Sequence, residues 1–104
     1  NKIMKKLEDK IVTALKTIYD PEIPVDIYEL GLIYDVDVNE HNDALVIMTL
    51  TSPNCPVAES LPKDVEDRVK SVNGINNCKI DLTFEPPWTR DMMSEEAKLE
   101  LGFL

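Results

Sequence analysis

The sequence contains few glycines, cysteines and basic residues, and each shortage excludes a class of protein. Only three glycines occur among 104 residues, and neither the phosphate loop GxxxxGK[ST] nor the dinucleotide pattern GxGxxG is present. Lys and Arg number 11 against 20 acidic residues, which gives a formal net charge of −9. Because a phosphate backbone is bound mainly through Lys and Arg, nucleic acid is not an expected partner.

The chain also lacks a long apolar run and a disulfide framework. The longest apolar stretch, Ala44 to Met48, is far shorter than the ~20 residues that cross a bilayer, so no membrane segment is expected. Two cysteines are too few for a secreted domain stabilised by disulfides, which favours a reducing, cytoplasmic setting. No signal peptide is expected at the start. The chain begins at Asn1 and not at methionine, so the sequence leaves open whether further residues precede it.

The remaining composition is that of one folded domain. Hydrophobic residues make up 43% and charged residues 30% of the chain, as in folded globular proteins. A length of 104 residues corresponds to about one domain, so a single domain over residues 1–104 is predicted.

The hydrophobic pattern predicts an α/β domain with the order α-β-β-α-β and a short C-terminal helix. Apolar residues three or four apart predict helices over residues 3–18 and 58–72, and Pro62 indicates a kink or a late start in the second. Alternating apolar residues predict strands over residues 32–39, 44–51 and 78–85. Ser94, Glu95 and Glu96 resemble the cap and acidic first turn of the last helix, which ends at Gly102.

The connections between these elements predict a mixed three-stranded sheet. A polar link of hairpin length, residues 39–43, makes the first two strands antiparallel. A right-handed crossover through the second helix makes the third strand parallel to the second. Helices are expected on one face, yet the uniformly apolar second strand also suggests a central position with both of its faces covered.

Cys55 is the first candidate for a functional residue. It follows the second strand and precedes Pro56, which suits a first helical turn, so its thiol is expected near free amides and the positive end of a helix. Such surroundings lower a thiol pKa and favour a thiolate that binds metal or attacks an electrophile. The alternative is a cysteine buried at a crowded turn. Position by itself does not separate the two.

The loop from Asp20 to Gly31 is unusually acidic and forms a second candidate. Its carboxylates could supply oxygen ligands for a metal or a base near a thiol, provided that the loop packs against the end of the sheet. In the simpler interpretation, which the spacing favours, Asp20 caps a turn and the other carboxylates are solvated. The carboxylates are Asp20, Glu22, Asp26 and Glu29.

The other reactive side chains are expected to be structural. Cys78 alternates with the apolar residues of the third strand, which is typical of a core position at the opposite end of the sheet from Cys55, so a disulfide is disfavoured. His41 lies in the polar hairpin link, so a Cys and His nucleophilic pair is not expected. An iron–sulfur cluster commonly needs four thiolates, so a cluster bound through Cys55 would be shared with another subunit, a partner or a small thiol.

A cluster of large apolar residues near the C-terminus forms a third candidate. Aromatic and methionine side chains are common anchors at protein interfaces, which makes this cluster a candidate docking surface for a partner. The alternative, which we favour on general grounds, is that it folds back over the small core. The cluster consists of Trp88, Met92, Met93, Phe103 and Leu104.

Four motifs, in this order, resemble those of the metal–sulfur cluster biosynthesis factors. That family includes the T-type proteins of the bacterial Suf system, the phenylacetate-oxygenase D proteins and the eukaryotic cytosolic iron–sulfur targeting factor. The likeness extends over nearly the whole chain and is greatest to the short Suf-type members. The motifs are residues 20–27 (DPEIPVDI), 30–34 (LGLIY), 50–56 (LTSPNCP) and 87–94, in which PWT is followed by MMS.

The resemblance implies an α/β domain that helps to assemble iron–sulfur clusters or to deliver them to recipient apo-proteins. It places the functional cysteine at Cys55 and the acidic motif at Asp20 and Glu22, with Glu29 as a further part of the same loop. Members also occur fused to, or beside, P-loop cluster-carrier ATPases, so any ATPase partner of this chain would be a separate protein. Cargo held through one thiol per chain, either a labile cluster or iron, would also favour a homodimer.

Two other functions remain open from the sequence. Cys55 could be the nucleophile of a thiol transferase or hydrolase, although no complete catalytic constellation is visible and an enzyme is not expected. The chain could also be a metal-free interaction adaptor. Loss of function in Cys55→Ala with intact fold and partner binding would support the cluster-assembly interpretation over the adaptor.

Overall fold

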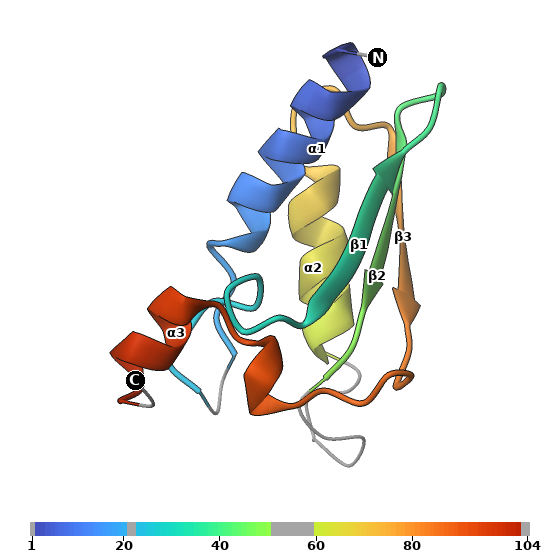
Figure 1. Cartoon of the computed structure of the whole chain (residues 1–104). Coiled ribbons are helices and arrows are strands. Elements are labelled where there is room, and N and C mark those ends of the chain that lie inside the picture. Colours follow the sequence, from blue (N-terminus) through green and yellow to red (C-terminus); the bar gives the residue numbers. More distant parts are fainter. Residues whose placement is uncertain (1, 21–22, 51–59, 103–104) are drawn as a thin grey trace.

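The computed structural model describes residues 2–20, 23–50 and 60–102. The predicted order of elements is confirmed, with a 3₁₀ turn added before the last helix (Figure 1). The elements are α1 (Lys2–Leu15), β1 (Ile33–Val38), β2 (Asp43–Met48), α2 (Ser60–Lys70), β3 (Asn77–Leu82), the 3₁₀ turn η2 (Arg90–Met92) and α3 (Glu95–Glu100).

The three strands form one mixed sheet in the order β1-β2-β3, as predicted. Strand β1 pairs with β2 in antiparallel register, and β2 pairs with β3 in parallel register. Helices α1 and α2 lie together on one side of this sheet, while α3 lies beyond its lower end (Figure 1). The connection through α2 therefore returns β3 beside β2 and parallel to it, as predicted for a strand–helix–strand crossover.

The expectation that both faces of β2 are covered is wrong, although its central position is confirmed. Ala44, Val46 and Met48 are buried, whereas Leu45 and Ile47 on the opposite face are only half-buried. Both long helices pack on the same side of the sheet, so no described element is left to cover the other side (Figure 1). The apolar run in β2 therefore supplies one buried face and one partly exposed face.

The core lies between the helices and the inner face of the sheet. Leu7, Ile11 and Leu15 are buried in α1, as its four-residue spacing predicts. From α2, Val65 and Val69 are completely buried against them. Full burial of such a side chain contributes about 1.5–3 kcal/mol, so these two stripes hold the helices on the sheet.

The helix boundaries follow the sequence signals except at the end of α1, which stops at Leu15 instead of residue 18 because the Thr17 and Ile18 amides bond to carbonyls only three residues back. Helix α2 begins at Ser60, which agrees with the late start that Pro62 favours, because proline is tolerated in a first turn. The Ser94 side chain accepts a hydrogen bond from the Ala97 amide, with an N–O distance of 3.1 Å, and so caps α3 as predicted. No helix within the described residues is long and apolar enough to cross a membrane.

Candidate functional site

The acidic loop, residues 20–31, begins at Asp20 and is described again over residues 23–31, which form bends and turns. Asp20 is 5% exposed, and its Oδ1 accepts a hydrogen bond of 3.1 Å from the Ile23 amide. Tyr19 and Asp26 form an isolated antiparallel bridge, and the Ile27 amide donates to the Ile18 carbonyl over 2.9 Å. The first acidic residue of the motif is therefore an ordered capping group, as the simpler interpretation of the sequence holds.

Asp26 holds the second half of the acidic loop. Its Oδ2 accepts hydrogen bonds from the amides of Tyr28, at 3.1 Å, and Glu29, at 3.0 Å. The Asp26 carbonyl also accepts from the Leu30 amide at 3.0 Å. The sequence predicts for Asp26 either a metal-ligand role or a solvated surface position, whereas in the structure its carboxylate is partly buried and holds a turn. The sequence signal for such a turn is an aspartate in a loop, because its carboxylate can accept hydrogen bonds from the amides two and three residues ahead.

Glu29 is partly buried and points toward helix α1. The Lys16 Nζ lies 3.6 Å from Glu29 Oε1 and 5.4 Å from the centre of the Tyr28 ring. The Glu29 carbonyl accepts a hydrogen bond of 2.8 Å from the Ser94 amide. Its side chain is 20% exposed, so Glu29 is held on both its side-chain and backbone atoms yet remains accessible to solvent.

Residues 86–94 pack against the end of the acidic loop. The Trp88 Nε1 donates to the Leu30 carbonyl over 2.7 Å. The carbonyl of Met92 approaches Gly31 so closely that a β-carbon there would lie 2.3 Å from the Met92 oxygen. Gly31 also has a φ of +83°, which glycine adopts without strain.

This packing bears on the proposed docking residues. Met93 is 5% exposed and belongs to the core, whereas Trp88 and Met92 are half-buried. The alternative that the cluster folds back over the core therefore holds for Met93, which is not available as an exposed anchor. Only Trp88 and Met92 of the three offer partly exposed surface. Phe103 and Leu104 lie outside the described residues.

The acidic loop meets the sheet where β2 ends. The Thr49 amide donates to the Leu32 carbonyl over 2.8 Å, which joins the residue after the loop to the residue after β2. Thr49 and Leu50 are buried, and the chain then continues into residues 51–59. Cys55 belongs to that segment, so its expected place beside Pro56 and a helix end lies outside the described residues, as does Glu22.

Thr49 is a residue that the sequence did not single out. Its side chain is fully buried, and its Oγ1 has no hydrogen-bond partner among the residues that the structure describes. Buried hydroxyl groups are almost always satisfied, so this one is exceptional. The sequence feature that could have identified Thr49 is its position as a polar residue at the end of an otherwise apolar strand.

The described residues do not form a metal site by themselves. No group of three or more His, Cys, Asp or Glu side chains within residues 2–20, 23–50 and 60–102 converges closely enough to hold an ion. Asp20 and Glu29 are engaged in the contacts described above. Metal binding by this region would need further ligands beside these carboxylates.

The chain closely matches known proteins. The family model described as "Iron-sulfur cluster assembly protein" matches residues 8–82. The chain belongs to this family. It is 61% identical over 97 residues to a Porphyromonas gingivalis protein named "Fe-S protein maturation auxiliary factor", covering 93% of this chain and 92% of that protein. A Staphylococcus aureus protein, "Fe-S protein maturation auxiliary factor SufT", is 39% identical, covering 82% of this chain and 97% of that protein.

The family fold is also shared with a solved structure. A crystal structure titled as a domain of unknown function, DUF59, from Bacillus anthracis superimposes with a TM-score of 0.91 at 37% identity, and the alignment covers 100% of both chains. This match confirms the predicted small α/β domain and the family resemblance drawn from the four sequence motifs.

The second cysteine of this family member is structural, as predicted. Cys78 pairs with Ala44 across β2 and β3 and is 7% exposed. Burial, assisted by the negative charge of Glu66, raises the pKa of the Cys78 thiol to about 11, so it stays protonated at neutral pH. His41 is exposed in the hairpin turn, also as predicted, and its amide donates to Asn39 Oδ1 at 2.9 Å.

Proposed function

We propose that this chain is an accessory factor in the cytoplasm that assembles iron–sulfur clusters or delivers them to recipient apo-proteins. The observation that carries the proposal is membership of the iron–sulfur cluster assembly family, together with 61% identity to a named maturation factor over nearly the whole of both chains. The proposed role is accessory rather than catalytic, because two relatives that the chain matches over most of their length are named maturation auxiliary factors.

In this proposal Cys55 supplies a transient thiolate ligand, and Asp20, Glu22 and Glu29 flank the site. The hydrogen bond between Thr49 and Leu32 supports this arrangement, because it joins the end of the acidic loop to the strand that leads into the segment with Cys55. The raised pKa of the buried Cys78 thiol argues against its use as a second ligand.

One thiolate per chain makes the cluster or iron a cargo rather than a resident cofactor. The remaining ligands would come from a second copy in a homodimer, from a partner protein or from a small thiol. Partners in this proposal are the assembly machinery, the recipient apo-proteins and a separate P-loop cluster-carrier ATPase. The exposed parts of Trp88 and Met92, beside the acidic loop, are the proposed docking anchors.

The test is anaerobic reconstitution with iron and sulfide, read as visible absorption and iron per chain. Wild type should take up iron, Cys55→Ala should lose that uptake, and Cys78→Ala should keep it as the matched control. Circular dichroism of all three proteins checks that the fold is intact.

The same experiment separates the alternatives. Uptake that persists in Cys55→Ala would contradict the assignment of the ligand. Absence of uptake in every protein would favour an adaptor that helps other proteins to receive clusters without binding metal itself. A Cys55-dependent turnover of a thioester or disulfide substrate would instead support the enzyme hypothesis.

A further inference from the structure

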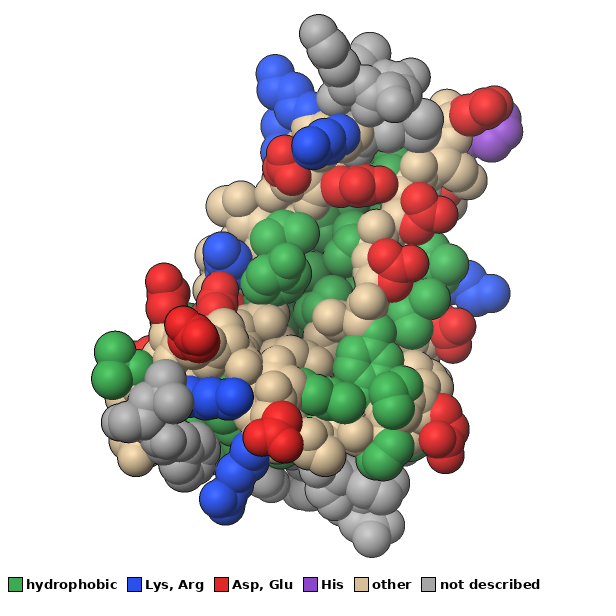
Figure 2. Space-filling model, viewed as in Figure 1, with side chains coloured by type: hydrophobic (Ala, Val, Ile, Leu, Met, Phe, Trp, Pro, Cys, Tyr) green, Lys and Arg blue, Asp and Glu red, His purple; other side chains and the backbone are tan. Residues whose placement is uncertain are grey.

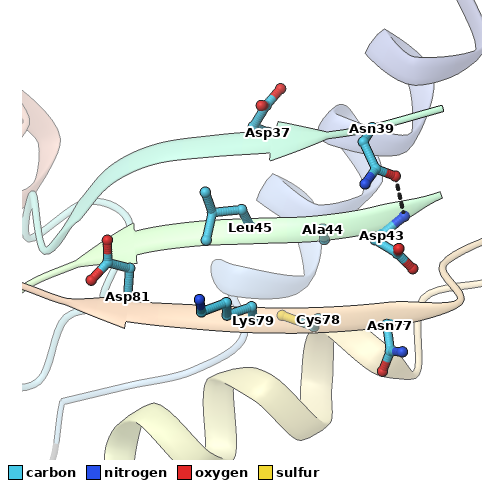
Figure 3. A pocket seen from close by; sticks show the side chains of 9 residues that line it. All are labelled: Asp37, Asn39, Asp43, Ala44, Leu45, Asn77, Cys78, Lys79 and Asp81. Atoms are coloured by element: carbon cyan, nitrogen blue, oxygen red, sulfur yellow. Dashed lines mark hydrogen bonds between the residues drawn. The ribbon is translucent and has the colours of Figure 1, made fainter. Parts of the chain in front are cut away.

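The face of the sheet that the helices leave open carries an apolar centre between charged edges. Leu45 and Ile47 of β2 point to this face and are half-buried. In cross-strand register, Leu45 lies between Asp37 of β1 and Lys79 of β3, and Ile47 lies between Asp35 and Asp81. Figure 3 shows Asp37, Leu45, Lys79 and Asp81 on this face, with the helices behind the sheet.

This surface, which we name the open sheet face, is strongly acidic. Four carboxylates, on Asp35, Asp37, Asp43 and Asp81, surround one ammonium group on Lys79. None of these five groups forms an ion pair with any residue that the structure describes. In Figure 2 acidic side chains run along the β1 side of the molecule, while Lys and Arg side chains lie near the N-terminal half of α1 and at scattered places elsewhere.

The helical side of the molecule is different. The four ion pairs of the described residues involve Lys16, Lys63 and Lys70, all on or directly after α1 and α2. Three lysines over the helices are thus paired, whereas Lys5, Lys6 and Lys10 of α1 are not paired with any described residue. The carboxylates of the open sheet face likewise have no cationic partner within the described chain. A partner that supplies cations would complete that pairing.

The open sheet face is also hollowed. A shallow depression of about 530 Å³ lies over β2 and β3 and is bordered by Asp37, Asp43, Leu45, Lys79 and Asp81 (Figure 3). Protein interfaces commonly combine a small apolar centre with a polar rim, and complementary charge selects the partner and speeds encounter. The open sheet face has both features.

We propose that the open sheet face docks a protein partner whose contact surface carries arginine or lysine on both sides of an aliphatic side chain. The aliphatic group covers Leu45 and Ile47, and the cations meet Asp35 and Asp37 on one side and Asp81 on the other. This inference deepens the proposed function, on which it rests, by naming the surface and chemistry through which the chain meets an assembly or recipient protein.

The spacing of the strands suggests a simple probe of this surface. Three neighbouring strands span about 10 Å, and alternate residues of an extended peptide lie about 7 Å apart. A capped heptapeptide with arginine, leucine and arginine at positions two, four and six and serine at the other positions can therefore place leucine over β2 and an arginine toward each outer strand.

The experiment is an NMR titration of the full chain with this heptapeptide at low salt. We expect saturable amide shifts confined to β1, β2 and β3, and none with a peptide in which glutamate replaces arginine. The double variant Asp37→Asn/Asp81→Asn should bind about fivefold more weakly, because exposed ion pairs are individually weak. The matched control, Glu95→Gln/Glu96→Gln, removes two charges from α3 and should bind as wild type.

Three results would overturn the proposal. They are shifts centred on the acidic loop, equal weakening by both double variants, and a dimer in sedimentation that Asp37→Asn/Asp81→Asn abolishes. The last result would assign the face to a second copy of the chain. Iron reconstitution of the same variants keeps the two proposals distinct, because Asp37→Asn/Asp81→Asn should take up iron as wild type does whether or not the peptide binds.

Discussion

The indole of Trp88 donates a hydrogen bond of 2.7 Å to the carbonyl of Leu30, 58 residues earlier in the chain. Leu30 directly follows Glu29, whose own carbonyl accepts from the Ser94 amide. Two backbone oxygens of the acidic loop are therefore held by the C-terminal segment. The turn that carries Glu29 is thus defined by residues that lie far away in sequence.

Replacing Trp88 with phenylalanine should lower the free energy of unfolding by about 1 kcal/mol, because it keeps an aromatic ring and removes one hydrogen bond. Urea denaturation followed by circular dichroism measures the change. Tyr28→Phe serves as a control for a hydroxyl outside this contact and should leave the midpoint unchanged. An unchanged midpoint for Trp88→Phe would show that the bond to Leu30 adds nothing to stability.

Gly31→Ala should destabilise the protein by about 3 kcal/mol, because the new methyl group meets the Met92 carbonyl and the residue keeps a positive φ. Gly102→Ala is the matched control. Gly102 has a similar φ of +82°, but its added methyl group meets no atom within 4 Å. It should therefore cost only the backbone strain, about 1 kcal/mol. Equal losses in thermal unfolding would contradict the close approach at Gly31.

Asp26→Ala should lower stability by about 1–2 kcal/mol, because the carboxylate accepts hydrogen bonds from two loop amides. Asp26→Asn keeps one carbonyl oxygen as an acceptor and should lose less. Amide hydrogen exchange at Tyr28 and Glu29 measures the effect locally and should speed up in the alanine variant. Unaltered exchange at both amides would indicate that other contacts hold the turn.

Thr49→Val should leave stability unchanged or raise it by up to about 1 kcal/mol, because a buried hydroxyl with no partner in the described part of the chain is replaced by a methyl group of similar shape. Thr83→Val is the control, since the Thr83 hydroxyl accepts a hydrogen bond of 3.2 Å from the Glu85 amide. That variant should lose stability. A large loss in Thr49→Val instead would mean that the hydroxyl is needed in the folded chain.

Stability should fall between about pH 9 and pH 11 because of Cys78. Its folded pKa of about 11 lies above the ordinary thiol pKa of 9.0, so over this range the unfolded thiol ionises while the folded thiol holds its proton. The unfolded state then binds fewer protons, which favours unfolding as the pH rises. Urea denaturation from pH 8 to pH 11 should show this loss in wild type, and the Cys78→Ala variant should show less of it.

The same burial predicts slow chemistry at Cys78. In a Cys55→Ala background the remaining thiol should resist iodoacetamide at pH 8 and react only after unfolding, because the thiolate is the attacking species. Mass spectrometry of the alkylated chain checks this directly. Rapid labelling of the folded protein would contradict both the burial and the raised pKa.

Local sequence patterns were sufficient to predict the helices and strands and their order, although not the 3₁₀ turn η2. The stripe of Leu7, Ile11 and Leu15 and the alternation in β1 and β3 are local patterns whose periods reflect backbone geometry, so they needed no tertiary information. Chain handedness then placed β3 parallel to β2. The family resemblance likewise depended on local motifs, and the match over residues 8–82 confirms it.

The surfaces that those elements cover could be known only from their packing in three dimensions. The apolar composition of β2 suggested two covered faces, but composition does not say on which side α1 and α2 pack, and both lie on one side (Figure 1). The same holds for the C-terminal segment, whose contacts with Leu30 and Gly31 join residues almost 60 positions apart. Such contacts depend on how elements stack in space, and no local period in the sequence encodes that stacking.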